Sequence, residues 1–179
     1  VRVIQYETES RIKTIREDVM HKGYAIGFSE LIKIIMTLVP SREDLSTPLR
    51  KTFTMFPEIA VRELVANALI HQDFLQTGTS VMIEIFPTRI EITNPGKPLV
   101  RIDRFLDSPP KSRNEKLASM MRRLEICEER GSGIDKVIHE IEIAQMPAPL
   151  FETLEDFTRV VLFSYRTLKN LTIEDRIRA

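Results

Sequence analysis

The chain has 179 residues, enough to bury a hydrophobic core, and its 42% hydrophobic and 29% charged residues are typical of a soluble globular protein. Lysine plus arginine equal aspartate plus glutamate at 26 each, so no overall field favours nucleic acid or membrane. The single cysteine, Cys127, excludes an internal disulfide framework, and no apolar run is long enough to span a bilayer. We therefore expect a cytoplasmic location and no membrane partner.

The first part of the chain has the hydrophobic spacing of helices. Ile12, Ile15 and Val19 fall on one face of a helix, and Gly23 follows as a stop signal. The pattern predicts helices over residues 7–21, 29–40 and 57–71, with a polar loop over residues 41–48.

From residue 80 the period changes to two. Val81, Ile83 and Ile85 alternate with polar or large residues, Pro87 and Thr88 turn the chain, and a second alternating run follows, which predicts a hairpin. Further along, we predict a loop over residues 98–113 with a helical turn near 102–106, helices over 114–126 and 134–145, and strands over 150–154 and 157–163. This order predicts an α+β fold, a two-layer α/β sandwich with helices on one face of a mostly antiparallel mixed sheet.

We divide the chain into three parts. Residues 1–48 are expected to be an N-terminal helical extension or linker, and residues 49–165 the main domain. Residues 166–179 are charged and are expected to be a linker tail toward a missing C-terminal module, so that the sequence is a fragment of a longer protein.

The helix predicted over residues 57–71 is apolar on almost every side but carries one polar stripe. At ~100° per residue, Glu63, Asn67 and His71 fall within an arc of about 80°. A carboxylate can accept a proton from water, and an amide oxygen is a hard neutral ligand suited to Mg²⁺. Glu-x-x-x-Asn alone is also compatible with a buried pair bonded to neighbouring loops, since sheltered polar groups need partners.

Two glycine-containing turns are further candidates. Gly131-Ser132-Gly133 lies ahead of a predicted helix, where free N–H groups and the helix dipole attract phosphate, although an ordinary turn explains it equally well. It is not a Walker A loop, because no Gly-Lys-Ser/Thr follows. Asn94-Pro95-Gly96 ends a predicted strand and is either a simple turn or a place where Asn94 faces a flat ligand.

A basic cluster follows in the sequence. Lys111, Arg113, Lys116, Arg122 and Arg123 are candidates for phosphate contacts. Arg122 and Arg123 are expected on a solvated helix face, and Arg113, in a loop after two prolines, is the better candidate.

In this order the motifs resemble one family. Segments 62–74, 89–96, 113–114 and 129–134, which contain Arg-Glu-Leu-Val-Ala-Asn, Thr-Asn-Pro-Gly and Arg-Gly-Ser-Gly-Ile, are similar to the RecG-related transcriptional regulators. The ATPase-like domain of that family belongs to the GHKL superfamily of gyrase B, MutL, chaperones and histidine kinases. The resemblance covers residues 56–163 and implies a Bergerat-like fold that holds ATP between helices and a mixed sheet.

The resemblance also implies roles for single residues. Glu63 corresponds to the general base, Asn67 to the Mg²⁺ ligand, and Gly131 and Gly133 to the glycine box around the phosphates. Asn94 and Gly96 stand where relatives carry Asp-x-Gly, whose aspartate accepts a hydrogen bond from adenine. Since an amide is neutral and can also donate, adenine selectivity is expected to be weaker or to be achieved differently.

The set expected to bind nucleotide is Asn67, His71, Asn94, Gly96, Arg113, Gly131, Ser132 and Gly133, with Glu63 as the catalytic residue and Asn67 also as metal ligand. The leading hypothesis is an ATP-binding, weakly hydrolysing, Mg²⁺-dependent GHKL-like domain of a bacterial or archaeal DNA-binding transcriptional regulator. DNA would be bound through modules outside this sequence. The alternative is a degenerate, catalytically inactive scaffold for homodimerisation or protein interaction.

Overall fold

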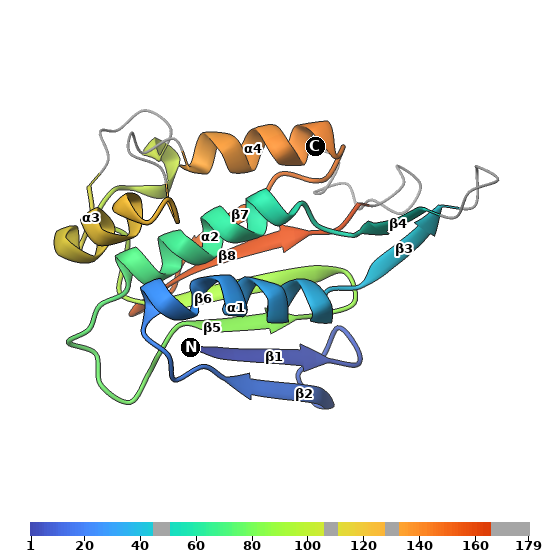
Figure 1. Cartoon of the computed structure of the whole chain (residues 1–179), viewed down its shortest axis with the longest axis horizontal. Coiled ribbons are helices and arrows are strands. Elements are labelled where there is room, and N and C mark those ends of the chain that lie inside the picture. Colours follow the sequence, from blue (N-terminus) through green and yellow to red (C-terminus); the bar gives the residue numbers. More distant parts are fainter. Residues whose placement is uncertain (45–50, 106–110, 128–132, 166–179) are drawn as a thin grey trace.

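A mixed six-stranded sheet forms one layer of the molecule, and helices cover one of its faces (Figure 1). The computed structural model describes residues 1–44, 51–105, 111–127 and 133–165. The strands in chain order are β1 (Arg2–Tyr6), β2 (Thr14–Val19), β5 (Met82–Ile85), β6 (Arg89–Pro95), β7 (Leu150–Thr153) and β8 (Phe157–Phe163). Their spatial order is β2-β1-β5-β6-β8-β7, and only β1 and β5 are parallel neighbours. The predicted two-layer α/β sandwich is confirmed.

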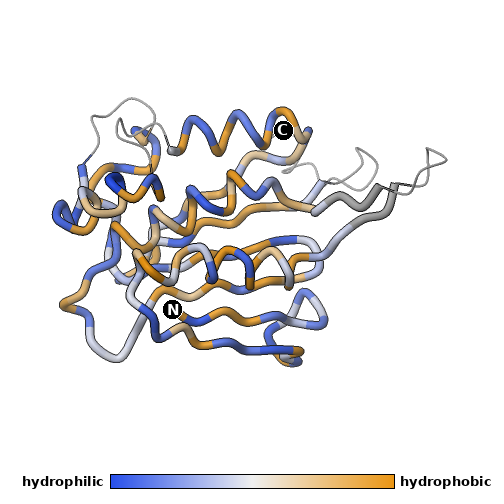
Figure 2. Tube along the Cα trace, viewed as in Figure 1, coloured by the Kyte–Doolittle hydropathy of each residue, from blue (hydrophilic) through white to orange (hydrophobic). Residues whose placement is uncertain are grey.

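The helices are α1 (Tyr24–Leu38), α2 (Glu58–His71), α3 (Glu115–Arg123) and α4 (Gly133–Ile143), with a 3₁₀ turn, η1, at Ile102–Arg104. The buried core lies between these helices and the sheet and includes Phe28, Leu69 and Ile83. Every second residue of β5, β6 and β8 belongs to this core, because side chains alternate between the two faces of a sheet: Ile83 and Ile85, Ile90 and Ile92, and Val160 and Leu162. Figure 2 shows the same division, with hydrophobic residues concentrated where helices and strands meet.

The opposite face of the sheet carries a smaller apolar cluster and a charged network. Ile4, Tyr6 and Phe86 form the apolar cluster. Glu84 and Glu91 are directly opposite each other on β5 and β6, and their carboxylates are almost fully buried. Arginines bind both of them, which is what buried carboxylates require.

The helix predicted over residues 7–21 is wrong, because this segment contains the end of a β-hairpin. The spacing of Ile12, Ile15 and Val19 imitated a helical face, but all three side chains are exposed, with Ile12 94% accessible. Strand β2 pairs with β1, which pairs in turn with the distant β5, and this pairing overrides the local pattern. The segment expected as an N-terminal extension therefore contributes two strands to the main sheet.

Other element boundaries differ less. Helix α1 starts at Tyr24 instead of residue 29. The loop predicted over residues 41–48 begins as a strand, β3 (Ser41–Asp44), which pairs with β4 (Lys51–Thr54) and projects beside the main body (Figure 1). The other predicted helices and strands, including the helical turn near residue 102, are confirmed within a few residues. Across the described residues, no helix is both long and apolar enough to cross a membrane.

Candidate functional site

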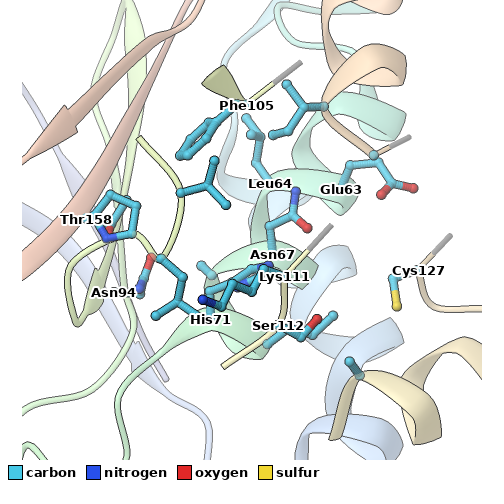
Figure 3. Close-up of a pocket in the computed structure, with 18 of the residues that line it drawn as sticks. Glu63, Leu64, Asn67, His71, Asn94, Phe105, Lys111, Ser112, Cys127 and Thr158 are labelled. Atoms are coloured by element: carbon cyan, nitrogen blue, oxygen red, sulfur yellow. The ribbon is translucent and has the colours of Figure 1, made fainter. Parts of the chain in front are cut away.

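A cavity of about 860 Å³ lies between α2, α3, the start of α4 and one end of the sheet (Figure 3). Helix α2 provides one wall, and β6 and β8 provide another. The segment after β6 and helix α3 complete it. Apolar side chains such as Leu64, Phe105 and Phe151 lie beside polar groups, which is the composition of a pocket for a ligand with both apolar and charged parts.

The polar stripe of α2 faces this cavity. Glu63, Asn67 and His71 all line it, while Val61, Val65 and Leu69 are buried in the core. Glu63 is only 8% exposed, and Asn67 and His71 are half-buried. The stripe is sheltered from solvent because it forms one wall of the cavity.

The first residue of α4 lies directly against this stripe. A Cβ atom placed on Gly133 would be 2.8 Å from Glu63 Oε2 and 3.6 Å from Asn67 Nδ2. Any side chain here would displace the Glu63 carboxylate, so glycine permits the close approach. Gly131 and Ser132, the other members of the predicted turn, lie outside the described residues.

Asn94 and Thr158 face each other across β6 and β8 at the far end of the cavity from Glu63. The two residues are register partners, and both line the cavity. Asn94 is 6% exposed, and its Nδ2 donates to the carbonyl oxygen of Pro95 at 3.1 Å. Thr158 Oγ1 donates to the Gly96 carbonyl oxygen at 2.7 Å. No sequence pattern singled out Thr158, because only the strand register places it beside Asn94.

Gly96 and Arg113 are not among the residues that line the cavity. Arg113 Nε donates to the His71 carbonyl oxygen at 3.2 Å, and its Nη2 donates to the Lys97 carbonyl oxygen at 2.7 Å. Gly96 has a φ of +102°, and a Cβ there would lie 3.0 Å from the Cβ of Asp73. Together they join the end of α2 to the segment after β6, so the structure gives them a positioning role at this edge of the site.

The imidazole of His71 is neutral at neutral pH. Burial lowers the pKa of His71 because it disfavours the charged form, and the nearby positive charge of Arg113 lowers that pKa further. The neutral ring can donate from one nitrogen and accept at the other, which suits contact with a polar ligand.

The sequence patterns did not favour several of the basic residues that line the cavity as phosphate contacts. Arg122, expected on a solvated helix face, lines the cavity, and so do Lys111 and Lys116. Lys97 was not singled out at all. These positions become neighbours only when α3 packs beside the end of α2, which the spacing along the chain does not show.

The donor chemistry suits a magnesium ion that is held mostly by a ligand and by water. In the described part of the chain, no three histidine, cysteine, aspartate or glutamate side chains gather as a metal cluster. Mg²⁺ commonly takes one or two protein oxygens together with substrate phosphates, so the Asn67 amide oxygen beside Glu63 and Gly133 fits this ion.

A family model matches part of the chain. Residues 78–162 match the family described as "Putative ATP-dependent DNA helicase recG C-terminal". This match supports a GHKL-like ATPase domain. Asn94, Gly133 and Thr158 lie within residues 78–162, whereas Glu63 and Asn67 precede the matched range.

A solved structure shares the fold. The DIP2311 protein from Corynebacterium diphtheriae superposes with a TM-score of 0.81 at 18% sequence identity, over 94% of this chain and 35% of that protein. The chain thus spans about a third of the length of this structural relative. A search of curated proteins gives no significant match.

Proposed function

We propose that this domain binds ATP with Mg²⁺ in the cavity between α2, α4 and the sheet and hydrolyses it slowly. The observation that carries the proposal is the convergence of three separate segments on one cavity. Helix α2 brings Glu63 and Asn67, the start of α4 brings Gly133, and strand β6 brings Asn94. The family match supports the same ligand.

The adenine end of the proposed site is formed by Asn94 and Thr158. Because the Asn94 amide nitrogen already donates to the Pro95 carbonyl, its oxygen is the group left to accept a hydrogen bond. A flipped amide would place two oxygens against each other at Pro95. Asn94 is therefore held as an acceptor, the role expected for a partner of the 6-amino group of adenine, and ATP should bind better than GTP.

The phosphate end is formed by the α2 stripe and the start of α4. Glu63 is positioned to orient a water molecule and accept its proton, and Asn67 would hold Mg²⁺ through its amide oxygen. Mg²⁺, when bound, supplies positive charge to the phosphate oxygens. Gly133 keeps this end open and lets the backbone at the start of α4 approach the phosphates.

A thermal-shift titration tests the binding. ATP with Mg²⁺ is expected to raise Tm in a concentration-dependent way, because a ligand that binds only the folded state stabilises it by mass action. GTP should raise Tm less. If well-folded protein shows no shift with any purine nucleotide, the proposal fails.

Hydrolysis separates the active enzyme from an inactive scaffold. Phosphate release by the wild type should exceed that of Glu63→Ala by about 10² or more, the usual contribution of a general base. Equal background rates would favour the alternative, a scaffold for homodimerisation or protein interaction.

We also propose that the domain serves a DNA-binding transcriptional regulator in the cytoplasm and that DNA is bound by modules outside residues 1–179. Equal numbers of acidic and basic residues give this piece no general attraction to DNA, and the name of the matching family refers to a DNA helicase. The isolated piece should not bind duplex DNA even at low salt, whereas the longer protein should. Salt-dependent DNA binding by the isolated piece would contradict this assignment.

A further inference from the structure

Four basic side chains that line the cavity have no ion-pair partner among the described residues. Lys97, Lys111, Lys116 and Arg122 come from the segment after β6, the segment before α3, and α3 itself. Within the described residues, none of them takes part in an ion pair. In the part of the chain that the structure describes, the acidic lining residues are Glu63, beside Asn67, and the exposed Glu115.

The opposite face of the sheet shows the contrast. There, Arg11, Arg89 and Arg159 all contact buried carboxylates, and the basic groups are compensated inside the protein. Among the described residues, a chain with no net charge thus places more basic than acidic side chains around its cavity. Such an arrangement attracts an anionic ligand and raises its local concentration.

One side of helix α3 faces the cavity and carries basic residues that can contact an anionic ligand. Met121 is buried and fixes the helix on the core, while Ser119 and Arg122 are half-buried and line the cavity beside the buried Ala118. Arg123, the next residue, is exposed and does not line it. A half-buried guanidinium is screened less by water than an exposed one, so Arg122 should contribute the most per contact.

We propose that α3 is the polyphosphate-binding wall of the site and that Arg122 is its main anion-binding residue, supported by Lys97, Lys111 and Lys116. The planar guanidinium suits the oxygens of a phosphate chain, which it can bind in a bidentate way. The wall selects for the number of phosphates and leaves recognition of the base to Asn94 and Thr158. That the ligand carries adenine rests on the proposed function, whereas binding of its phosphate chain by α3 does not.

The test compares two neighbouring arginines. Arg122→Gln removes the lining charge, and Arg123→Gln removes an equal charge one residue away as the matched control. Affinities for ATP, AMP and inorganic tripolyphosphate are measured by calorimetry with Mg²⁺ present, and circular dichroism checks that each variant is folded. Arg122→Gln should weaken ATP and tripolyphosphate about tenfold and AMP by about twofold or less, since a hydrogen bond to a charged group contributes enough for that change. Arg123→Gln should change each affinity by about twofold or less, as expected of a solvated charge.

The outcomes separate this inference from the proposed function. If tripolyphosphate binds in an Arg122-dependent way but no adenine nucleotide binds, the polyphosphate wall stands and the ATP proposal fails. If ATP binds equally to the wild type and both variants, the ATP proposal stands and the wall is overturned. If the folded wild type binds neither ATP nor tripolyphosphate, both are overturned. Should Arg122→Gln fail to fold, Lys116→Gln with Lys111→Gln takes its place, and unchanged tripolyphosphate binding by that double variant overturns the wall.

Discussion

Substitution of Gly133 by alanine should impair hydrolysis while leaving the fold intact. The new Cβ would lie 2.8 Å from Glu63 Oε2, and ordinary contact begins near 3.4 Å, so the carboxylate must move by about 0.6 Å. This oxygen is at the free end of a flexible side chain, and alanine is favourable in a helix, so the free energy of unfolding should stay within about 1 kcal/mol of wild type. Because a displacement of ~1 Å at a reacting group costs about 10²-fold, we expect kcat for ATP hydrolysis to fall about tenfold.

The assay is phosphate release under saturating ATP and Mg²⁺, with Tm measured in parallel. Gly23→Ala is the control, because a Cβ at Gly23 meets nothing within 4 Å. In a Glu63→Ala background, Gly133→Ala should cause no further loss, since the group that it displaces is already absent. A Gly133→Ala protein with wild-type kcat would refute the argument that the start of α4 positions the Glu63 carboxylate.

Two further predictions concern stability. Arg11 bridges Glu84 and Glu91, with its Nε 2.6 Å from Glu84 Oε1, so Arg11→Ala should lower the free energy of unfolding in urea by about 2–3 kcal/mol by leaving Glu84 without a cation. Arg16→Ala is the control, because Arg16 pairs with Asp18 at an exposed position, and it should lower the free energy of unfolding by less than about 1 kcal/mol. Equal losses of stability in Arg11→Ala and Arg16→Ala would contradict a special contribution from the buried carboxylates. The folded pKa of His71 lies below its usual 6.5, so as pH falls below about 6.5 the unfolded chain takes up a proton that the folded chain excludes. This group should therefore lower the free energy of unfolding by at most about 1.4 kcal/mol for each unit by which the pH falls. Urea unfolding at pH ~7.5 and ~5.5 should show a smaller decrease in stability for His71→Gln than for the wild type. An equal decrease in both proteins would exclude His71 as a source of the pH dependence.

The local elements of the fold could be predicted from the sequence where each element has its own periodicity. The apolar circumference of α2 and the alternation in β5 and β6 are properties of consecutive residues, and these elements are confirmed. The first hairpin could not be predicted, because β1 is fixed by parallel pairing with β5, some eighty residues further along the chain. Non-local pairing leaves no local pattern to detect.

The candidate site likewise contains residues that a local pattern predicts and residues that only distant contacts bring together. Its α2 stripe was visible because Glu63, Asn67 and His71 repeat every four residues on one helix. Only the tertiary structure decided that Thr158 pairs with Asn94. These contacts depend on strand register across the sheet.

The basic residues show most clearly which features of the site cannot be predicted from the sequence. The sequence favoured Arg113, which the structure uses to join α2 to the segment after β6, over Arg122, which lines the cavity. Both are arginines near prolines or helix ends, and composition does not separate them. Which side chains are available, what charge they carry and which helix presents Glu63, Asn67 and His71 can all be inferred from the order of residues along the chain. The packing of α3 and α4 against α2 decided which of them share one cavity, because that depends on the burial of distant apolar faces such as Met121 and Val137.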